Sequence, residues 1–432
     1  MLAALGFIMI VVFMYLIMSK KLHPLTALII IPIVFALIGG FGSSIGSMML
    51  EGVKAIAPTG IMLIFAILFF SIMTDAGLFE PMISKLLYIV KGDPLKVIIG
   101  TAVLALCVSL DGDGSTTYII VVSAMLPVYK RLGINSLILT SMCMLAGGVM
   151  NILPWGGPTA RVITSLNLES SQVFTPIIPV MFFGAFWVLF VAWYFGIRER
   201  KRLGIIDVEH QQQVEDSIVA ENKSTRRPKL IWINLLLTII LMVSLVMNVL
   251  PLAVLFMIAF CAGLIINFPS LDEQRARINE HAGNALAVAS MVFAAGIFTG
   301  ILTGTKMVDA MAASLVALIP ESMGPNFPVI TGVTSVPFTF FMNNDSYYFG
   351  IVPVLAKAAA AFEINSAEMA RASLLGQPVH LLSPLVPSTY LLTGMAGVDF
   401  GDHQRFTLKW AIGTVLVMLI FSILTGVIGL RI

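Results

Sequence analysis

Long apolar segments recur along almost the whole chain and limit the folds open to it. A helix needs about 20 mostly apolar residues to cross the ~30 Å hydrocarbon core of a bilayer. Segments that qualify, some only with polar breaks, are 2–18, 24–41, 58–78, 134–167, 175–197, 230–249, 251–268, 285–304, 366–398 and 408–430. Only 11% of the residues are charged, against about a quarter in soluble domains. The sequence therefore predicts an all-α polytopic membrane protein.

Charge and cysteine usage exclude several classes of function. The chain has 25 Lys and Arg against 23 Asp and Glu, so it lacks the basic field that attracts nucleic acid. Its three cysteines lie in apolar runs without the spacing of a metal or haem site. We expect no nucleic acid partner and no tightly bound cofactor.

Basic residues in the polar loops predict the orientation. One side of the predicted spans carries Lys20-Lys21, Lys130-Arg131, the hydrophilic stretch 198–229, Arg275 with Arg277, and Arg405 with Lys409. Loops rich in Lys and Arg stay in the cytoplasm. The stretch 198–229 is thus predicted to be a cytoplasmic linker, and both termini to lie outside. Lys54, Lys306 and Lys357 lie on the other side and weaken this asymmetry.

Two further apolar segments, 94–131 and 326–362, have a polar centre. This pattern predicts a helical hairpin that re-enters the membrane and returns to the same face. Backbone groups in lipid must form hydrogen bonds with the protein itself, so such a turn requires a buried or water-filled position. We expect both hairpins to line a cavity.

A shift of 230 residues superposes the two halves of the chain. It aligns Asn135 with Asn365 and Thr159 with Thr389, and it brings the spans and both polar centres into register. The predicted units are 1–197, with hairpin 94–131 and broken helix 134–167, and 230–432, with hairpin 326–362 and broken helix 366–398. Each unit has five crossings, so the second is inverted relative to the first. Inverted repeats with broken helices are typical of secondary transporters, although a pore is also possible.

The first polar centre is rich in acids and hydroxyls. Gly112 and Gly114 permit a tight turn, Asp111 and Asp113 supply negative charge, and Ser115 and Thr116 supply hydroxyls. Ionisable groups at this depth are costly and indicate function. The alternative is that the two aspartates cap helix ends.

The second polar centre is rich in amides. Its residues are Asn343, Asn344, Asp345 and Ser346. The 230-residue shift aligns them with the first centre; both centres are polar, but their acidic residues stand at different positions. The two tips are therefore predicted to form a site that is symmetric in position and unequal in chemistry.

Prolines and glycines interrupt the two broken helices and free backbone groups within an apolar span. The first interruption supplies Asn151, Gly156, Gly157, Thr159 and Arg161, and the second supplies Gln377, His380, Ser388 and Thr389. Arg161 either binds a carboxylate through two hydrogen bonds or extends to the outer interface. His380 is either a substrate contact linked to protons or a packing residue.

Four stretches resemble the citrate–metal:proton symporter family of the ion-transporter superfamily. They are 23–28, 91–96, 110–117 and 151–161, and the resemblance extends along nearly the whole chain. It implies import of citrate complexed with a divalent cation, Mg²⁺-like or Ca²⁺-like, driven by protons across a bacterial cell membrane. It also implies a homodimer of elevator type, with a scaffold and a moving transport domain. The cation would travel with the substrate.

By the same resemblance, the two tips and the two interruptions form the substrate site. The implied substrate contacts are Ser115, Thr116, Asn151, Gly156, Gly157, Thr159, Arg161, Asn343, Asn344, Ser346, Gln377, His380, Ser388 and Thr389. The implied groups for metal or proton coupling are Asp111, Asp113 and Asp345.

The tips depart from the Ser-Asn-Thr tips of sodium-coupled relatives, which favours protons or a substrate-borne metal. Free citrate, with about three negative charges, would be repelled by the three aspartates. Competing hypotheses are a sodium- or proton-coupled symporter of di- or tricarboxylates without metal, a channel, and an intramembrane aspartyl protease that uses Gly112-Asp113. We expect a transporter and not an enzyme.

Overall fold

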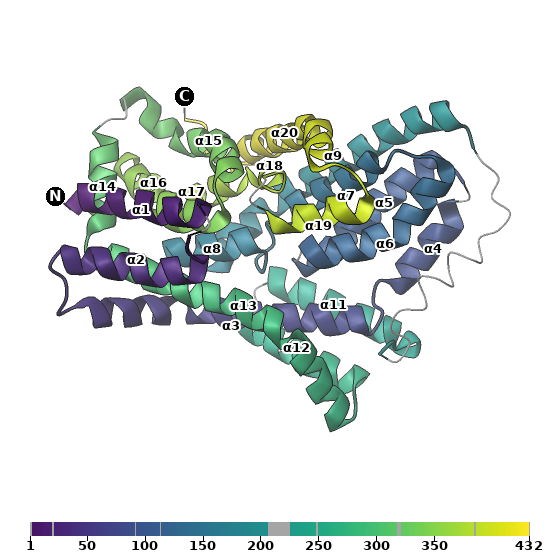
Figure 1. The fold of residues 1–432 in the computed structure, drawn as a ribbon, viewed down its shortest axis with the longest axis horizontal. Helices are drawn as coiled ribbons and strands as arrows, with labels where there is room; N and C mark the ends of the chain where they lie inside the picture. The colour runs from purple at the N-terminus through teal and green to yellow at the C-terminus, as the bar shows by residue number, and fades with distance from the viewer. Residues whose placement is uncertain are drawn as a thin grey trace.

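The computed structural model describes residues 2–19, 21–90, 92–112, 114–205, 225–247, 249–317, 321–383 and 386–431. Within these ranges the regular structure is entirely helical (Figure 1). Six segments there are long and apolar enough to cross a membrane, judged by length and composition. They are Ile45–Asp75, Pro94–Asp111, Ser170–Leu203, Pro228–Leu245, Leu271–Gly304 and Phe400–Leu424.

The first half of the chain contains one turn between two helices and one break within a helical segment. Its elements are α1 (Leu2–Met18), α2 (Pro24–Ile38), α3 (Ile45–Asp75), α4 (Glu80–Val90), α5 (Pro94–Val108), η1 (Ser109–Asp111), α6 (Gly114–Leu132), α7 (Ser136–Met150), α8 (Gly157–Leu166) and α9 (Ser170–Leu203). The chain turns between α5 and α6, and it breaks between α7 and α8.

The second half presents its long helices, its turn and its break in the same order. Its elements are η2 (Pro228–Leu230), α11 (Ile231–Val246), α12 (Leu252–Asn267), α13 (Leu271–Gly304), α14 (Met307–Val316), η3 (Glu321–Asn326), α15 (Phe327–Phe341), the π-helical turn η4 (Ser346–Ile351), α16 (Val352–Ala359), η5 (Ala360–Phe362), α17 (Ser366–Leu374), α18 (Gln377–His380), α19 (Pro387–Ala396) and α20 (Phe400–Leu424).

Local sequence explains where the equivalent helices begin. The Asn135 side chain accepts a hydrogen bond from the Leu137 N–H at 2.9 Å and caps α7. Asn365, which the 230-residue shift aligns with Asn135, accepts from the Glu368 N–H at 2.8 Å and caps α17. Both caps satisfy an N–H group that has no partner within its helix.

Helices α3 and α13 lie side by side and form the longest helix pair of the fold (Figure 1). Their small residues allow a close approach, because a Cβ added to Gly52 would lie 2.0 Å from the carbonyl oxygen of Gly296. Gly304 faces Met48 near the start of α3, and Arg277 pairs with Asp75 at its end. Residue numbers thus fall along α13 as they rise along α3, so the two helices are antiparallel.

Both helices are longer than their predicted spans, 58–78 and 285–304. Helix α3 begins at Ile45, and α13 begins at Leu271 after the Ser270 cap, whose hydroxyl accepts from the Glu273 N–H at 3.2 Å. The first three turns of α13 are polar and mostly exposed. Hydropathy therefore predicts only the apolar part of a helix that continues into a polar environment.

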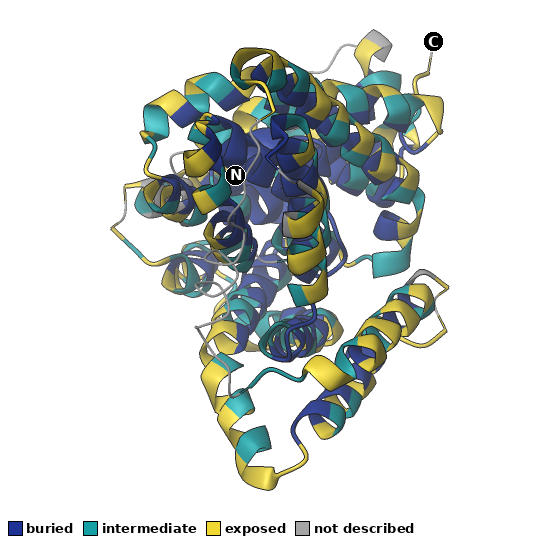
Figure 2. Cartoon of the chain, turned by 90° about the vertical axis from the view of Figure 1, so that its right-hand side faces the viewer, coloured by how far each residue is buried: buried dark blue, intermediate teal, exposed yellow. Residues whose placement is uncertain are grey.

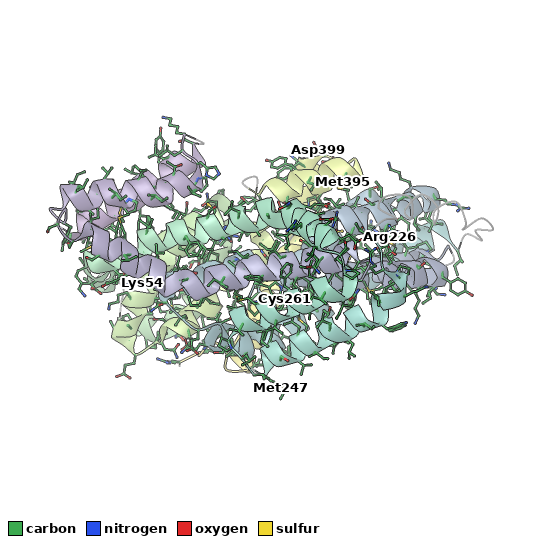
Figure 3. The ribbon with its side chains drawn as sticks, turned by 90° about the horizontal axis from the view of Figure 1, so that it is seen from below. Lys54, Arg226, Met247, Cys261, Met395 and Asp399 are labelled. Carbon is green, nitrogen blue, oxygen red and sulfur yellow. The ribbon has the colours of Figure 1, made fainter. Side chains whose placement is uncertain are left out.

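The end of the predicted linker is held against the first half. Arg226 pairs with Glu80 at 2.7 Å, and the Arg227 N–H donates to the Ala76 carbonyl at 3.0 Å. Arg227 also pairs with Glu273 at 2.9 Å. Burial raises the pKa of the Glu80 carboxyl above its ordinary value, and Arg226 opposes this rise. These contacts join the start of α4 to the start of α13, and Figure 3 labels Arg226 near that junction.

One acidic residue pairs with two of the lysines on the predicted outer side. Asp309, at the start of α14, lies 2.9 Å from the Lys357 ammonium and 3.9 Å from that of Lys306. This cluster carries one net positive charge instead of two.

Buried residues gather inside the helix bundle, and exposed residues follow its outer faces (Figure 2). Many exposed side chains are large and apolar, notably around α11, where Trp232 is 75% exposed and Met247, directly after the helix, is 70% exposed. Figure 3 labels Met247 at the edge of the molecule. Apolar residues on an outer face are expected where lipid replaces water.

Candidate functional site

A cavity of about 330 Å³ lies where the two turns and the two breaks meet. Its walls come from the α5–α6 turn, the α7–α8 break, the α15–η4 turn and the segment from α18 to α19. The lining residues are Ser109, Gly112, Gly114, Thr117, Gly147, Asn151, Gly157, Pro158, Arg161, Asn344, His380, Leu381, Val386 and Ser388. Segments far apart in the sequence thus enclose one space.

Packing against Trp155 shapes the first tip. The Trp155 indole N–H donates to the Leu110 carbonyl at 2.8 Å. Gly112 has φ +77°, and a Cβ added there would lie 2.8 Å from the indole ring, so both conformation and space require glycine. Asp111 is buried within this turn. Asp113 lies outside the described residues.

An internal cap shapes the second tip. The Asn343 side chain accepts a hydrogen bond from the Ser346 N–H at 2.8 Å. This bond closes the turn between α15 and the π-helical segment η4 and leaves Asn344 on the cavity wall. A π-helical turn is rare and is often found at functional sites.

Arg161 and Asp345 form an ion pair beside the cavity. The Arg161 Nε donates to Asp345 Oδ1 at 2.6 Å, and its Nη1 donates to the Gly157 carbonyl at 3.0 Å. Arg161 lines the main cavity and, with Asp345, a smaller space bordered by Leu63 of α3 and Val292 of α13. In this structure Arg161 thus points to the second tip, which differs from the predicted alternative of a side chain extended to the outer interface.

Thr159 and Thr389 stabilise the two breaks. The Thr159 hydroxyl donates to the Ile152 carbonyl at 2.7 Å, and the Thr389 hydroxyl donates to the Leu381 carbonyl at 2.5 Å. Both side chains are fully buried. These bonds satisfy carbonyl groups that the breaks remove from the regular helix pattern. Neither threonine lines the cavity wall.

A chain of amides joins three of the four walls. The Asn151 Nδ2 donates to Gln377 Oε1 at 3.2 Å. The Gln377 Nε2 donates to Asn344 Oδ1 at 3.1 Å and to the Tyr348 hydroxyl at 2.8 Å. Gln377 is fully buried, and its side chain holds the first break, the second break and the second tip in a fixed relation.

His380 is buried on the cavity wall, and its Nδ1 lies 2.6 Å from the Thr339 carbonyl. A carbonyl only accepts hydrogen bonds, so Nδ1 carries the proton of this bond. A neutral ring then has an acceptor at Nε2. The bond to Thr339 agrees with a packing role for His380, and its position on the cavity wall agrees with a substrate contact.

The remaining predicted residues differ in how close they come to the cavity. Gly157 and Ser388 line it, whereas Ser115, Thr116 and Gly156 are absent from its wall. A Cβ added to Gly156 would lie 2.1 Å from the Asn151 carbonyl oxygen, so this glycine is required by the break. Sequence reasoning did not predict several lining residues as site residues: Ser109, Gly112, Gly114, Thr117, Gly147, Pro158, Leu381 and Val386. All of them lie within the predicted hairpin 94–131 or the two predicted broken helices.

No group of three His, Cys, Asp or Glu side chains that could hold a metal ion occurs among the residues that the structure describes.

Comparison with known proteins identifies the family. The profile of the citrate transporter family matches residues 3–376. The chain belongs to the citrate transporter family. A protein of Bacillus subtilis (strain 168) named "Citrate transporter" is 62% identical over 429 residues, which cover 99% of this chain and 100% of that protein. Another from the same organism, named "Mg(2+)/citrate complex secondary transporter", is 52% identical over the full length of both chains.

Family membership confirms the resemblance found in the sequence. The family and these relatives are transporters and not enzymes, which removes the intramembrane protease hypothesis. This member of the citrate transporter family is a multi-pass membrane protein.

A solved structure supports the fold. The YdaH transporter of Alcanivorax borkumensis superposes with a TM-score of 0.60 over 90% of this chain and 88% of that chain. The two sequences are 14% identical, so the likeness concerns the fold alone. The helical architecture of this citrate transporter family member is thus also that of another transporter.

Proposed function

We propose that the protein imports citrate as a complex with a divalent cation, in symport with protons. The observation that carries this proposal is the mixture of charge at the cavity. The Arg161 guanidinium lies on its wall and contacts Asp345, while Asp111 is buried at the adjacent tip. The site thus offers a positive group to a carboxylate and negative groups to a cation.

Electrostatics favours the complex over free citrate. Citrate has about three negative charges near neutral pH, and close carboxylates repel it in a medium of low dielectric constant. A bound divalent cation reduces that charge to about one, which a single guanidinium can balance. The name of the 52% identical relative, a Mg²⁺/citrate transporter, agrees with this reading. Mg²⁺ and Ca²⁺ both use oxygen ligands, and both are candidates as cargo.

Asp111, Asp113 and Asp345 are the proposed groups for metal or proton coupling, and the other predicted site residues are the proposed substrate contacts. Among them, Arg161, Asn151, Asn344, His380, Gly157 and Ser388 line the cavity. The proton coupling rests on the resemblance and on the excess of acids at the tips. A sodium-coupled symporter of free carboxylates is the alternative, and cation dependence distinguishes the two.

We propose an inverted repeat because equivalent helices meet in opposite directions. A shift of 229 residues aligns α3 with α13, and these two helices form the antiparallel pair at the centre of the fold. Two equivalent helices that pack antiparallel are related by a rotation of about half a turn in the membrane plane, as transporter repeats commonly are. The proposed cytoplasmic linker and outside termini follow from this topology and from the basic loops.

The two halves are packed differently, which supports a carrier with two states. Helix α8 packs against both α3 and α13, whereas its counterpart α19 packs on α6, α7 and α20 without comparable contact to that pair among the described residues. Helix α1 packs on α14, whereas the described residues of α11 and α4 have no comparable contact. Exchange of these arrangements would open the cavity to the other side. We propose an elevator motion along the α3–α13 scaffold.

The proposed homodimer would bury part of the outer apolar surface. Helix α11 is a candidate for that interface because Trp232, Leu236 and Ile240 are exposed on it. Cross-linking of the protein in native membranes tests the dimer separately from transport. A single band at the monomer mass under all cross-linking conditions would remove this part of the proposal.

Uptake of labelled citrate into proteoliposomes tests the function. One divalent cation is supplied at a time, at two pH gradients, with and without a protonophore. The proposal predicts saturable uptake that requires a divalent cation and is reduced by the protonophore. Sodium-dependent uptake without a divalent cation would favour the alternative symporter, and non-saturating conductance would favour a channel.

A further inference from the structure

Two buried hydroxyl groups on the cavity wall have no hydrogen-bond partner in the described structure. Ser109 is 5% exposed and Thr117 is fully buried, and both line the cavity. Neither hydroxyl oxygen forms a hydrogen bond with the protein. Buried polar groups are nearly always hydrogen-bonded, so two exceptions on one wall require an explanation.

Both hydroxyls lack the hydrogen bond to a backbone carbonyl that Ser and Thr residues in helices commonly form. Ser and Thr in helices commonly donate to a carbonyl one turn earlier. Thr101, in the same helix α5 that leads to Ser109, does so with Val97 at 2.8 Å. At the position equivalent to Ser109 in the second half, Thr339 donates to the Ser335 carbonyl at 2.7 Å. Ser109 thus differs from its equivalent, Thr339, because its hydroxyl has no partner among the described residues.

The two residues flank the first tip, which packing holds in place. Ser109 directly follows α5 and Thr117 lies in the first turn of α6. Between them, the Leu110 carbonyl is fixed by the Trp155 indole. Rotation about χ1 between staggered positions reorients a hydroxyl without movement of the backbone. Both hydroxyl oxygens are covered in this structure, so a ligand engages them only after such a rotation turns them toward the cavity.

We infer that Ser109 and Thr117 are substrate-contacting residues, and that their hydroxyls donate to carboxylate oxygens of the citrate–cation complex. This inference rests on the proposed function and extends it. Arg161 binds one part of the substrate from the α7–α8 break, and the two hydroxyls bind another part from the first tip. Neutral donors suit carboxylates that the cation already partly neutralises, since a further full charge is not needed there.

Thr164 provides a matched control. Its hydroxyl is also buried and without a partner, and its side chain is 4% exposed on α8. Thr164 does not line the cavity. Thr164→Val therefore reports the effect of removing a buried unpaired hydroxyl that is remote from the substrate.

The experiment measures the KM for citrate uptake in the presence of Mg²⁺ and the thermal midpoint of the purified protein without citrate. Ser109→Ala and Thr117→Val are each expected to raise KM about tenfold, which corresponds to one hydrogen bond of about 1.4 kcal/mol. Their midpoints without citrate should equal or exceed the wild-type value, because no hydrogen bond is lost. Thr164→Val should leave KM unchanged.

Thr117→Ser keeps the hydroxyl and should retain a KM close to the wild-type value. The inference is overturned if both Ser109→Ala and Thr117→Val keep KM within twofold of wild type, or if Thr164→Val raises it equally. If a variant loses thermal stability, the hydroxyl had a structural role and the inference is also overturned. Wild-type protein that does not take up citrate would instead reject the proposed function, so the two failures are distinguishable.

Discussion

Arg161 Nε donates to Asp345 Oδ1 at 2.6 Å and joins the broken helix of the first half to the hairpin tip of the second. The pair borders the helices α3 and α13 on one side and the cavity on the other. An isolated guanidinium or carboxylate there would lose most of its hydration, so each group stabilises the other when the site is empty. A substrate carboxylate that binds Arg161 must compete with Asp345.

Replacement of Arg161 should strongly impair transport. We expect Arg161→Gln to reduce uptake of Mg²⁺-citrate by about a hundredfold or more, because a charge-assisted contact is lost and Asp345 is left unpaired. Arg161→Lys should recover part of the activity, since the charge remains while the planar fork is lost. Initial uptake rates in proteoliposomes measure both. Wild-type rates in Arg161→Gln would exclude a substrate role for this residue.

Asp345→Asn should change the pH dependence of uptake. The amide cannot take up or release a proton in the physiological range, so the rate should vary less with external pH than in the wild type. Asp309→Asn is the control, because this acid pairs with Lys357 away from the cavity. Uptake is measured at a series of external pH values with a fixed cation. An unchanged profile and unchanged cation dependence in Asp345→Asn would contradict its coupling role.

Gly52→Ala should destabilise the central helix pair. The added Cβ would lie 2.0 Å from the Gly296 carbonyl oxygen, and such overpacking costs about 1–3 kcal/mol. Gly46→Ala, in the same helix, has no atom within 4 Å of the new Cβ, and it should be neutral or slightly stabilising. Thermal unfolding in detergent compares the two. Equal midpoints would show that α3 and α13 separate easily.

Gln377→Leu should lower stability and transport together. It removes the partner of Asn151, Asn344 and Tyr348 in a buried network, and each unpaired buried group costs about 1–3 kcal/mol. We expect a lower thermal midpoint and a higher KM. Gln404→Leu, which removes one bond to the Leu382 carbonyl, is the control with a smaller effect. A Gln377→Leu protein as stable as the wild type would show that the network does not hold the cavity walls.

A cross-link between α8 and α13 should arrest the carrier. Ala160 and Val292 border the same small space beside the ion pair, and the proposed motion separates their helices. With the native cysteines replaced, a short bifunctional thiol reagent should join Ala160→Cys to Val292→Cys and block uptake. A cleavable reagent allows recovery on reduction. Full uptake by the cross-linked protein would contradict movement of α8 along the scaffold.

The local pattern of the sequence predicted the parts of the site but not their contacts. Helices end at the polar centres after Val108 and Phe341 and at the prolines and glycines after Asn151 and Gln377. The sequence predicts these ends because the end of a helix depends on local residues. The pairing of Arg161 with Asp345 spans 184 residues. No spacing rule links residues so far apart, so the sequence alone does not predict which group Arg161 contacts.

By itself, the sequence determined that this chain crosses a membrane repeatedly, because the length of each apolar segment can be read directly from the residues. The correspondence of its two halves is a prediction from the 230-residue shift. Its resemblance to one family also identified its class. Only the tertiary structure decided which hydroxyl groups form hydrogen bonds within the protein. Thr159 and Thr389 donate to backbone carbonyls of the breaks, whereas Ser109 and Thr117 have no partner among the described residues beside the cavity. All four side chains carry a hydroxyl group, and the difference arises from which carbonyl groups the packing brings within reach.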